Sequence, residues 1–114
     1  MNITRFAPSP TGRLHLGHAY SAVIGRNRGD AFRLRIEDLD PTRCRPEHVD
    51  GIIEDLEWLG LNWDGPVIVQ SQRAAQYQSA LDRLRGMGLA YPCFCTRGDI
   101  AAALQAPQGT SGGR

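Results

Sequence analysis

The sequence predicts an α/β fold built around a parallel sheet. Short segments with the pattern of a strand alternate along the chain with longer segments whose apolar residues recur at helical spacing. This alternation is typical of parallel sheets, because each helix carries the chain back to the end of the sheet where the next strand begins. The 114 residues suffice for one ordinary domain with a single core.

The first predicted strand covers residues 3–7 and runs into residues 8–12, where two prolines and a glycine in five residues predict a loop. Apolar residues at helical spacing then predict a helix that begins near His15 and ends before Gly29. Residues 32–37 alternate strictly between apolar and charged side chains, which predicts the second strand.

The rest of the chain continues the alternation of helices and strands. Pro46 suits the first turn of a second helix, which Gly60 ends. A short strand at 66–69 is followed by a third predicted helix, which Gly86-Met87-Gly88 ends and which is marked by Ala74, Tyr77, Leu81 and Leu84. An extended segment at 91–95 and a short helix from Ile100 behind an N-cap at Thr96 complete the prediction. Residues 108–114 are rich in glycine and predict a linker, so we expect the chain to be the N-terminal portion of a longer protein.

The composition is that of a soluble globular protein, with 41% apolar and 22% charged residues. No apolar run approaches the roughly 18 residues that cross a membrane, and the first ten residues lack a signal-peptide pattern. We therefore expect a cytoplasmic protein without a membrane partner. The net charge of +1 neither favours nor excludes a nucleic-acid partner. All 13 basic residues are arginine, so any lysine that the chemistry needs must come from outside these residues.

The segment 8–18, with the sequence PSPTGRLHLGH, carries the strongest chemical signal. It follows the first strand and opens a helix, where α/β sheets bind ligands and free backbone N–H groups favour phosphate. His15 and His18 share one helical face, so both can donate toward a phosphoryl group. Gly17 between them lets a flat ring such as adenine approach the backbone. The alternative is a loop that caps a helix with two unrelated histidines, and the intervening glycine and the proline-rich loop disfavour it.

The three cysteines make a poor disulfide framework, because Cys93 and Cys95 are separated by one residue and Cys44 is remote. Two thiolates at this spacing can bind one tetrahedral Zn²⁺, which then needs two more ligands. Considered alone, the pattern more often represents two half-buried thiols than a zinc site.

Three motifs, RFAPSPTG at 5–12, HLGH at 15–18 and RIEDLD at 35–40, resemble in this order the glutamate-specific class I aminoacyl-tRNA synthetases. The resemblance covers residues 3–100 and implies a Rossmann-type catalytic domain that activates glutamate with ATP and Mg²⁺ and passes the glutamyl group to a tRNA. Within the family the sequence is most similar to the short paralogues without an anticodon-binding domain. These enzymes attach glutamate to the queuosine base of tRNA(Asp), and the resemblance implies a monomer for the full-length protein.

The resemblance implies roles for individual residues. The ATP contacts fall on Pro8, Thr11, His15, Gly17 and His18, and among them His15 and His18 are the catalytic histidines that stabilise the transition state at the phosphates.

The glutamate contacts implied by the resemblance fall on Arg5, Ala7, Ser9 and Glu37, and Glu37 matches the residue that holds the α-ammonium group. The residue pattern agrees, because a fixed positive charge and a fixed negative charge at neighbouring strand ends suit a zwitterion with an extra carboxylate. The alternative for Glu37 is an ion pair on the surface with Arg35 or Arg33. Asp38 and Asp40 fit turn residues better than metal ligands.

The resemblance also divides the chain into a nucleotide- and glutamate-binding half over 1–92 and the start of a zinc-binding insertion over 93–114, in which Cys93 and Cys95 bind zinc. The family's second signature, a loop that carries a lysine, has no counterpart in this lysine-free chain. Three alternatives stay open: a glutamyl-tRNA synthetase that charges the tRNA 3′ end, an inactive truncated fragment, and a small-molecule nucleotidylyltransferase.

Overall fold

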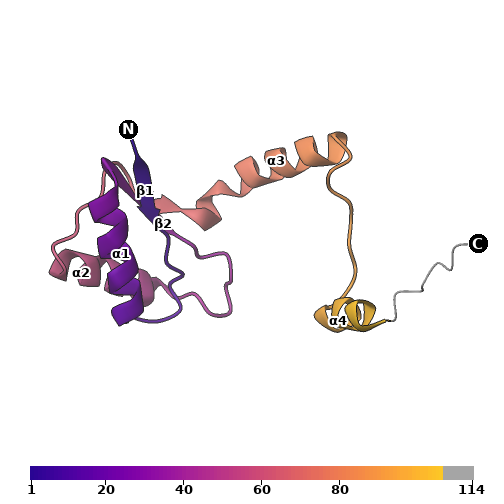
Figure 1. The fold of residues 1–114 in the computed structure, drawn as a ribbon, viewed down its shortest axis with the longest axis horizontal. Coiled ribbons are helices and arrows are strands. Elements are labelled where there is room, and N and C mark those ends of the chain that lie inside the picture. The colour runs from indigo at the N-terminus through magenta and orange to yellow at the C-terminus, as the bar shows by residue number, and fades with distance from the viewer. Residues whose placement is uncertain (107–114) are drawn as a thin grey trace, which may run out of the picture. The chain divides into compact units, whose positions relative to one another are not determined.

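A computed structural model describes residues 1–106 of the chain (Figure 1). It divides into two compact units, Met1–Gln78 and Ser79–Arg114, and each is described by itself. The linker predicted at 108–114 lies outside the described residues.

The first unit is a parallel sheet with helices between its strands, as the sequence predicts. Strands β1 (Ile3–Phe6), β2 (Ala31–Ile36) and β3 (Ile68–Val69) lie in the order β1-β2-β3. The register pairs Ile3 with Ala31 in the first ladder and Arg35 with Ile68 in the second. The third strand is shorter than predicted, because only its last two residues pair with β2.

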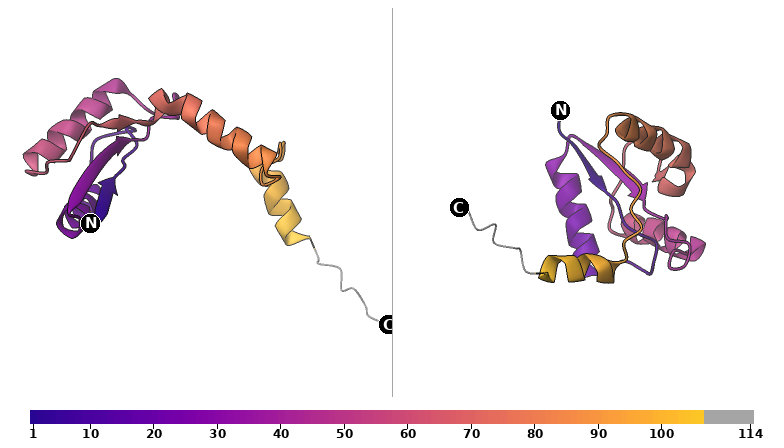
Figure 2. Two further views of the ribbon diagram at one scale, coloured as in Figure 1. Left: turned by 90° about the horizontal axis from the view of Figure 1, so that it is seen from above. Right: turned by 90° about the vertical axis from the view of Figure 1, so that its right-hand side faces the viewer.

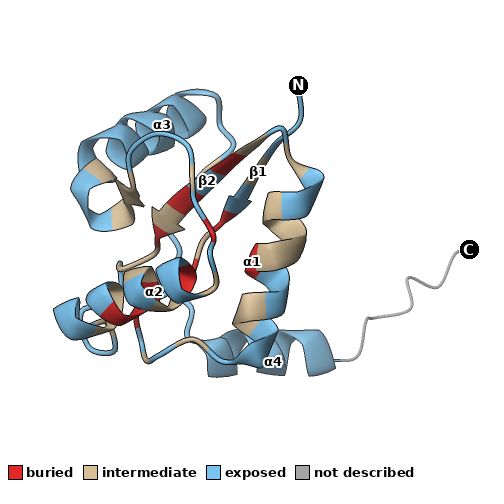
Figure 3. Ribbon diagram, turned by 90° about the vertical axis from the view of Figure 1, so that its left-hand side faces the viewer, coloured by how far each residue is buried: buried red, intermediate tan, exposed pale blue. Residues whose placement is uncertain are grey.

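The core lies on one face of the sheet, under helices α1 (Leu16–Arg28) and α2 (Pro46–Trp58) (Figure 3). The side chains of Phe32, Leu34 and Ile36 alternate onto this face of β2 and are completely buried. Figure 2 shows α1 alongside β1 and β2 in both views. Two successive crossovers in the same direction explain why both helices cover the same face.

The other face of the sheet carries the charged half of the alternating pattern. Arg5 and Arg33 are paired neighbours in the ladder, and both side chains are exposed. Arg35 follows two residues later on the same face. The face of the sheet opposite the core therefore presents guanidinium groups near the carboxyl ends of β1 and β2.

Gly29 ends α1 in a crowded position, and we expect Gly29→Ala to destabilise the first unit. A Cβ there would lie 2.2 Å from the Thr4 Oγ1 and 2.6 Å from the carbonyl oxygen of Ala31, so the backbone must shift. The expected loss in the free energy of unfolding is about 1–3 kcal/mol, measured by urea denaturation. The control is Gly86→Ala, because nothing lies within 4 Å of a Cβ there. Equal stability of both variants would contradict the expectation.

The short 3-10 helix η1 (Gln70–Arg73) and helix α3 (Ala74–Gly86) follow β3. Helix α4 (Arg97–Gln105) belongs to the second unit and has the predicted N-cap. The Thr96 Oγ1 accepts the Asp99 N–H at 3.1 Å, and the Asp99 carboxylate accepts the Thr96 N–H at 2.7 Å. The helix starts at Arg97, earlier than predicted, because the capping residue leads directly into it. Among residues 1–106, no helix is both long and apolar enough to cross a bilayer.

Candidate functional site

The loop formed by residues 7–15 connects β1 to α1 and is fixed to the rest of the first unit by backbone hydrogen bonds. The Glu37 N–H donates to the Pro8 carbonyl at 3.0 Å, and the Arg45 N–H donates to the Pro10 carbonyl at 3.1 Å. Both prolines are buried. The first part of the loop is thereby held against the segment that follows β2, at the carboxyl end of the parallel strands, where α/β sheets bind ligands.

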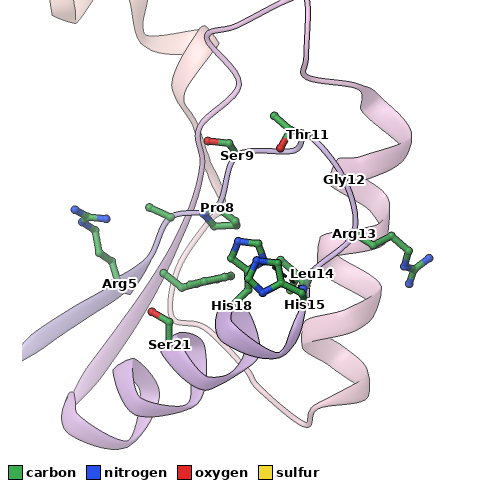
Figure 4. Close-up of a pocket in the computed structure, with 12 residues that line it drawn as sticks. Arg5, Pro8, Ser9, Thr11, Gly12, Arg13, Leu14, His15, His18 and Ser21 are labelled. Atoms are coloured by element: carbon green, nitrogen blue, oxygen red, sulfur yellow. Dashed lines mark hydrogen bonds between the residues drawn. The ribbon is translucent and has the colours of Figure 1, made fainter.

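A pocket of about 610 Å³ opens between this loop and the start of α1 (Figure 4). Its lining includes most of the residues that the sequence predicts for the site, namely Arg5, Ala7, Pro8, Ser9, Thr11, His15 and His18. Phe6, Gly12, Arg13, Leu14 and Ser21 complete the lining. The structure thus collects three of the four predicted glutamate-binding residues, Arg5 on β1 and Ala7 and Ser9 in the loop, around one cavity with the two predicted catalytic histidines. Gly17 and Glu37 are not among the residues that line it.

The imidazoles of His15 and His18 stack on each other, with ring centroids 3.7 Å apart and planes inclined by 24°. Each ring also caps the helix. The Gly17 N–H donates to the Nδ1 of His15 at 3.1 Å, and the His15 backbone N–H donates to the Nδ1 of His18 at 3.2 Å. Because each Nδ1 is an acceptor here, a neutral ring carries its proton on Nε2. Both histidines are therefore set to donate through Nε2, as a phosphate oxygen requires.

Sequence reasoning missed this capping box. The usual pattern is Ser or Thr at the N-cap with Glu three residues later, and here His15 and His18 take those two places. The spacing of three residues was available in the sequence as a signal.

The structure gives a reason for glycine at position 17 that the sequence did not reveal. A Cβ at this position would lie 3.0 Å from the Cε1 and 3.2 Å from the Nδ1 of His15. A side chain at this position would therefore require the His15 imidazole to move by a few tenths of an ångström. The closer approach of an adenine ring to Gly17 stays a prediction.

The pKa of His18 is lowered, by burial first and by the neighbouring His15 second. The folded state therefore binds this proton less readily than the unfolded chain, whose histidine has a pKa of about 6.5. The stability contributed by neutral His18 is present above about pH 6.5 and is lost as the pH falls from there through the lower folded pKa.

We expect His18 to titrate below pH 6.5 in a ¹H–¹³C NMR titration of the imidazole Cε1–H signals. The signal of the stacked His15 ring should respond to this titration, because the charge that His18 gains lies beside it. A His18 that titrates at or above pH 6.5 would contradict the arrangement.

Arg5 and Glu37 differ in how available their charges are. The Arg5 side chain is exposed, lines the pocket, and has no ion-pair partner in the part of the chain that the structure describes. Glu37 lies just after β2, and its Oε1 accepts a hydrogen bond from the Nη2 of Arg35. The surface ion pair that the sequence left open for Glu37 is thus present, and its α-ammonium role stays a prediction. The Nε of Arg35 is buried, and among residues 1–106 it has no hydrogen-bond partner.

Of the other acidic residues in the third motif, Asp40 stabilises a turn, as the sequence predicts, whereas Asp38 makes a long-range contact instead. The Asp38 carboxylate accepts the Ser71 N–H at 2.8 Å and the Ser71 hydroxyl at 2.7 Å, which joins the end of β2 to η1. Burial opposes ionisation of Asp38, but these hydrogen bonds lower its pKa. The hydroxyl and N–H of Thr42 lower the pKa of Asp40 in the same way.

The cysteines remain unpaired. Cys93 and Cys95 are exposed free thiols in the second unit, and Cys44 donates a weak hydrogen bond to the Glu37 carbonyl at 3.8 Å. The described residues contain no group of three or more His, Cys, Asp or Glu side chains that could hold a metal. Two thiolates alone do not complete a tetrahedral zinc site.

The known proteins to which this chain is similar belong to the family that its motifs resemble. Residues 2–110 match the family model of the catalytic domain of class I tRNA synthetases (E and Q). The glutamyl-Q tRNA(Asp) synthetase of Rhodobacter capsulatus is 53% identical over 110 residues, which are 93% of this chain and 40% of that protein. The glutamate–tRNA ligase of Nostoc punctiforme is 49% identical over 106 residues, which are 90% of this chain and 22% of that protein.

Solved structures show the same similarity. The crystal structure of a glutamate tRNA ligase from Elizabethkingia meningosepticum, in complex with its amino acid, matches 90% of this chain and 23% of its own with a TM-score of 0.72 and 35% identity. The chain thus spans less than half the length of each of these relatives.

Proposed function

The chain belongs to the class I tRNA synthetases specific for glutamate and glutamine, and we propose that its pocket binds ATP and glutamate for the formation of glutamyl-adenylate. The observation that carries the proposal is the single cavity that contains Arg5, Ala7 and Ser9 together with His15 and His18. The crystallised relative with a bound amino acid supports it, because that relative shares the fold around the pocket.

In the proposed reaction, a carboxylate oxygen of glutamate attacks the α-phosphorus of ATP in line, the bond from this phosphorus to the bridging oxygen breaks, and pyrophosphate leaves. His15 and His18 donate through Nε2 to the phosphate oxygens on which charge develops. The N-terminus of α1 adds a partial positive charge. Mg²⁺ would neutralise phosphate charge, and ATP oxygens and water supply most of its ligands, so a protein carboxylate cage is not required.

The glutamate is recognised through its charges. The guanidinium of Arg5, which has no ion-pair partner among residues 1–106, suits a bidentate contact with a carboxylate. Glu37 does not line the pocket, but its N–H donates to the carbonyl of Pro8, which does. Arg35 donates to the Oε1 of Glu37, which leaves Oε2 for the substrate ammonium group. No protein nucleophile takes part in this mechanism.

We infer transfer of the glutamyl group to the queuosine base of tRNA(Asp) as the second step. Six of the relatives at 46–53% identity are glutamyl-Q tRNA(Asp) synthetases. The second candidate is charging of the tRNA 3′ end, which the ligases at 48–49% identity favour. The family resemblance also supports a cytoplasmic location and a monomeric full-length protein. It further supports Cys93 and Cys95 as two of the four ligands of a zinc-binding insertion that starts within residues 93–114.

The test is glutamate-dependent ATP–pyrophosphate exchange, in the absence of tRNA, by the natural polypeptide that contains residues 1–114. We expect exchange with glutamate and none with aspartate. A chimera in which residues 1–110 replace the matching segment of the Rhodobacter capsulatus relative is assayed in parallel. Exchange by the chimera alone would identify the natural polypeptide as an inactive fragment, and its absence from both would contradict the proposed function.

The acceptor is tested by transfer of labelled glutamate from the same polypeptide. We expect labelling of tRNA(Asp) that bears queuosine, and none of tRNA(Asp) without queuosine or of tRNA(Glu). Labelling of tRNA(Glu) would select the second candidate.

A further inference from the structure

Arg13 connects the loop formed by residues 7–15 to helix α2. Its Nη2 lies 2.6 Å from the Oδ1 of Asp55 and 3.3 Å from the Oε2 of Glu54. The side chain passes over Gly51, where an added Cβ would lie 3.7 Å from its Nη1. Figure 4 shows Arg13 on the outer side of the loop, with its side chain directed away from the two histidines.

This contact holds the part of the loop that the backbone tethers do not reach. The hydrogen bonds to the carbonyls of Pro8 and Pro10 fix only the first half of the loop. Between Pro10 and the start of α1 at Leu16, the loop is held by the Leu14 side chain, which packs against the core, by the ion pair of Arg13 and, at its end, by the capping hydrogen bonds of His15. The loop ends two residues after Arg13, at His15.

We propose that Arg13, through its ion pair with Asp55, is a positioning residue that sets the stacked pair His15 and His18 for contact with the ATP phosphates. The inference rests on the proposed function of the pocket. His15 is the N-cap of α1, and its ring is the platform on which His18 stacks. A shift of the loop at Arg13 is therefore passed to both imidazoles, and misplacement of catalytic donors by about 1 Å is costly to catalysis.

The ion pair contributes little to the stability of the fold. A role of Arg13 in positioning the histidines can therefore be distinguished from a role in stabilising the fold. The Arg13 side chain is 61% exposed, and its partner Asp55 is 26% exposed. Exposed ion pairs stabilise folded proteins weakly, because water screens the charges. Asp55 is the principal partner, because it is closer to Arg13 and less exposed than Glu54.

The test compares Arg13→Met, Asp55→Asn and the double variant in the 114-residue chain. We expect each single variant to weaken ATP binding about threefold to fivefold, as an ion pair worth up to about 1 kcal/mol allows, measured by equilibrium dialysis, and the double variant to be no weaker than either single one. Arg13→Lys keeps the charge without the planar guanidinium and should recover part of the affinity. The control variants Glu54→Gln and Arg28→Met should bind ATP within about twofold of the wild type.

The melting temperature and the imidazole ¹⁵N shifts complete the test. We expect all variants to have the melting temperature of the wild type. In the wild type His15 and His18 should carry the proton on Nε2, whereas in Arg13→Met both should show a mixture of tautomers. The inference would be overturned if Arg13→Met bound ATP with wild-type affinity and showed unchanged ¹⁵N shifts. It would also be overturned if Arg13→Met and the control Arg28→Met lost the same amount of ATP affinity. If the 114-residue chain binds no ATP, the exchange assay of the chimera decides the proposed function, and the tautomers alone decide the role of Arg13.

Discussion

Replacement of His15 or His18 by alanine is expected to lower kcat for glutamate-dependent ATP–pyrophosphate exchange by about 10²–10³-fold. Each variant removes one Nε2–H donor from the pocket, and the loss of one positioned donor to a developing negative charge costs a factor of this size. The effect should appear in kcat more than in the KM for glutamate, because the phosphate charge grows in the transition state. The assay uses the active form identified by the exchange experiment above.

Two further variants separate this chemistry from the capping of α1. His15→Asn retains a side-chain acceptor suited to an N-cap but loses the Nε2 donor, so it should fold normally and exchange slowly. His48→Ala is the matched control, since His48 lies on α2 and does not line the pocket. Exchange by His15→Asn at the wild-type rate would contradict a role of the imidazole donor.

Phe32→Ala is expected to destabilise the first unit by about 3–5 kcal/mol in the free energy of unfolding. The Phe32 ring is completely buried under α1, where it lies 3.2 Å from the position that a Cβ on Gly25 would take. Its loss leaves a cavity beneath the helix that carries both histidines. A loss of this size is a large share of the stability of a small domain.

Urea denaturation followed by circular dichroism measures this loss. Phe94→Ala is the control, because the Phe94 side chain is 94% exposed and its removal should change stability by no more than about 0.5 kcal/mol. Should Phe32→Ala fail to fold, Phe32→Leu provides a milder variant for the same comparison. Equal midpoints for Phe32→Leu, Phe94→Ala and the wild type would contradict the assignment of the core.

The fold could be predicted well from the sequence, because its signals are local. The strict alternation of β2 identifies Phe32, Leu34 and Ile36 as the buried face, and the structure buries all three. Pro46 at the first turn and the Thr96 N-cap also mark real helix starts. The pairing of Arg5 with Arg33 depends on the register between strands, which is set by packing over a long sequence separation and leaves no local signal.

The site could be predicted only in part. The loop and the histidine pair follow from the order of residues 8–18, since a strand, a loop and a helix start place them at one end of the sheet. The stacking and capping of the imidazoles were not predicted, because histidine is an unusual N-cap and the contact depends on the three-dimensional position of both rings. The choice of Arg35 as partner for Glu37 was one of two that the sequence allowed, because both arginines share the charged face of β2.

Whether His15 and His18 face a bound nucleotide is measured most directly by ¹⁵N NMR of the imidazoles while ATP is added to the 114-residue chain. The prediction is that the Nε2 signals of both histidines shift together and saturate at one ATP per chain, whereas those of His48 stay in place. Shifts confined to His48, or no shift at His15 and His18 while ATP binds, would show that the nucleotide lies elsewhere.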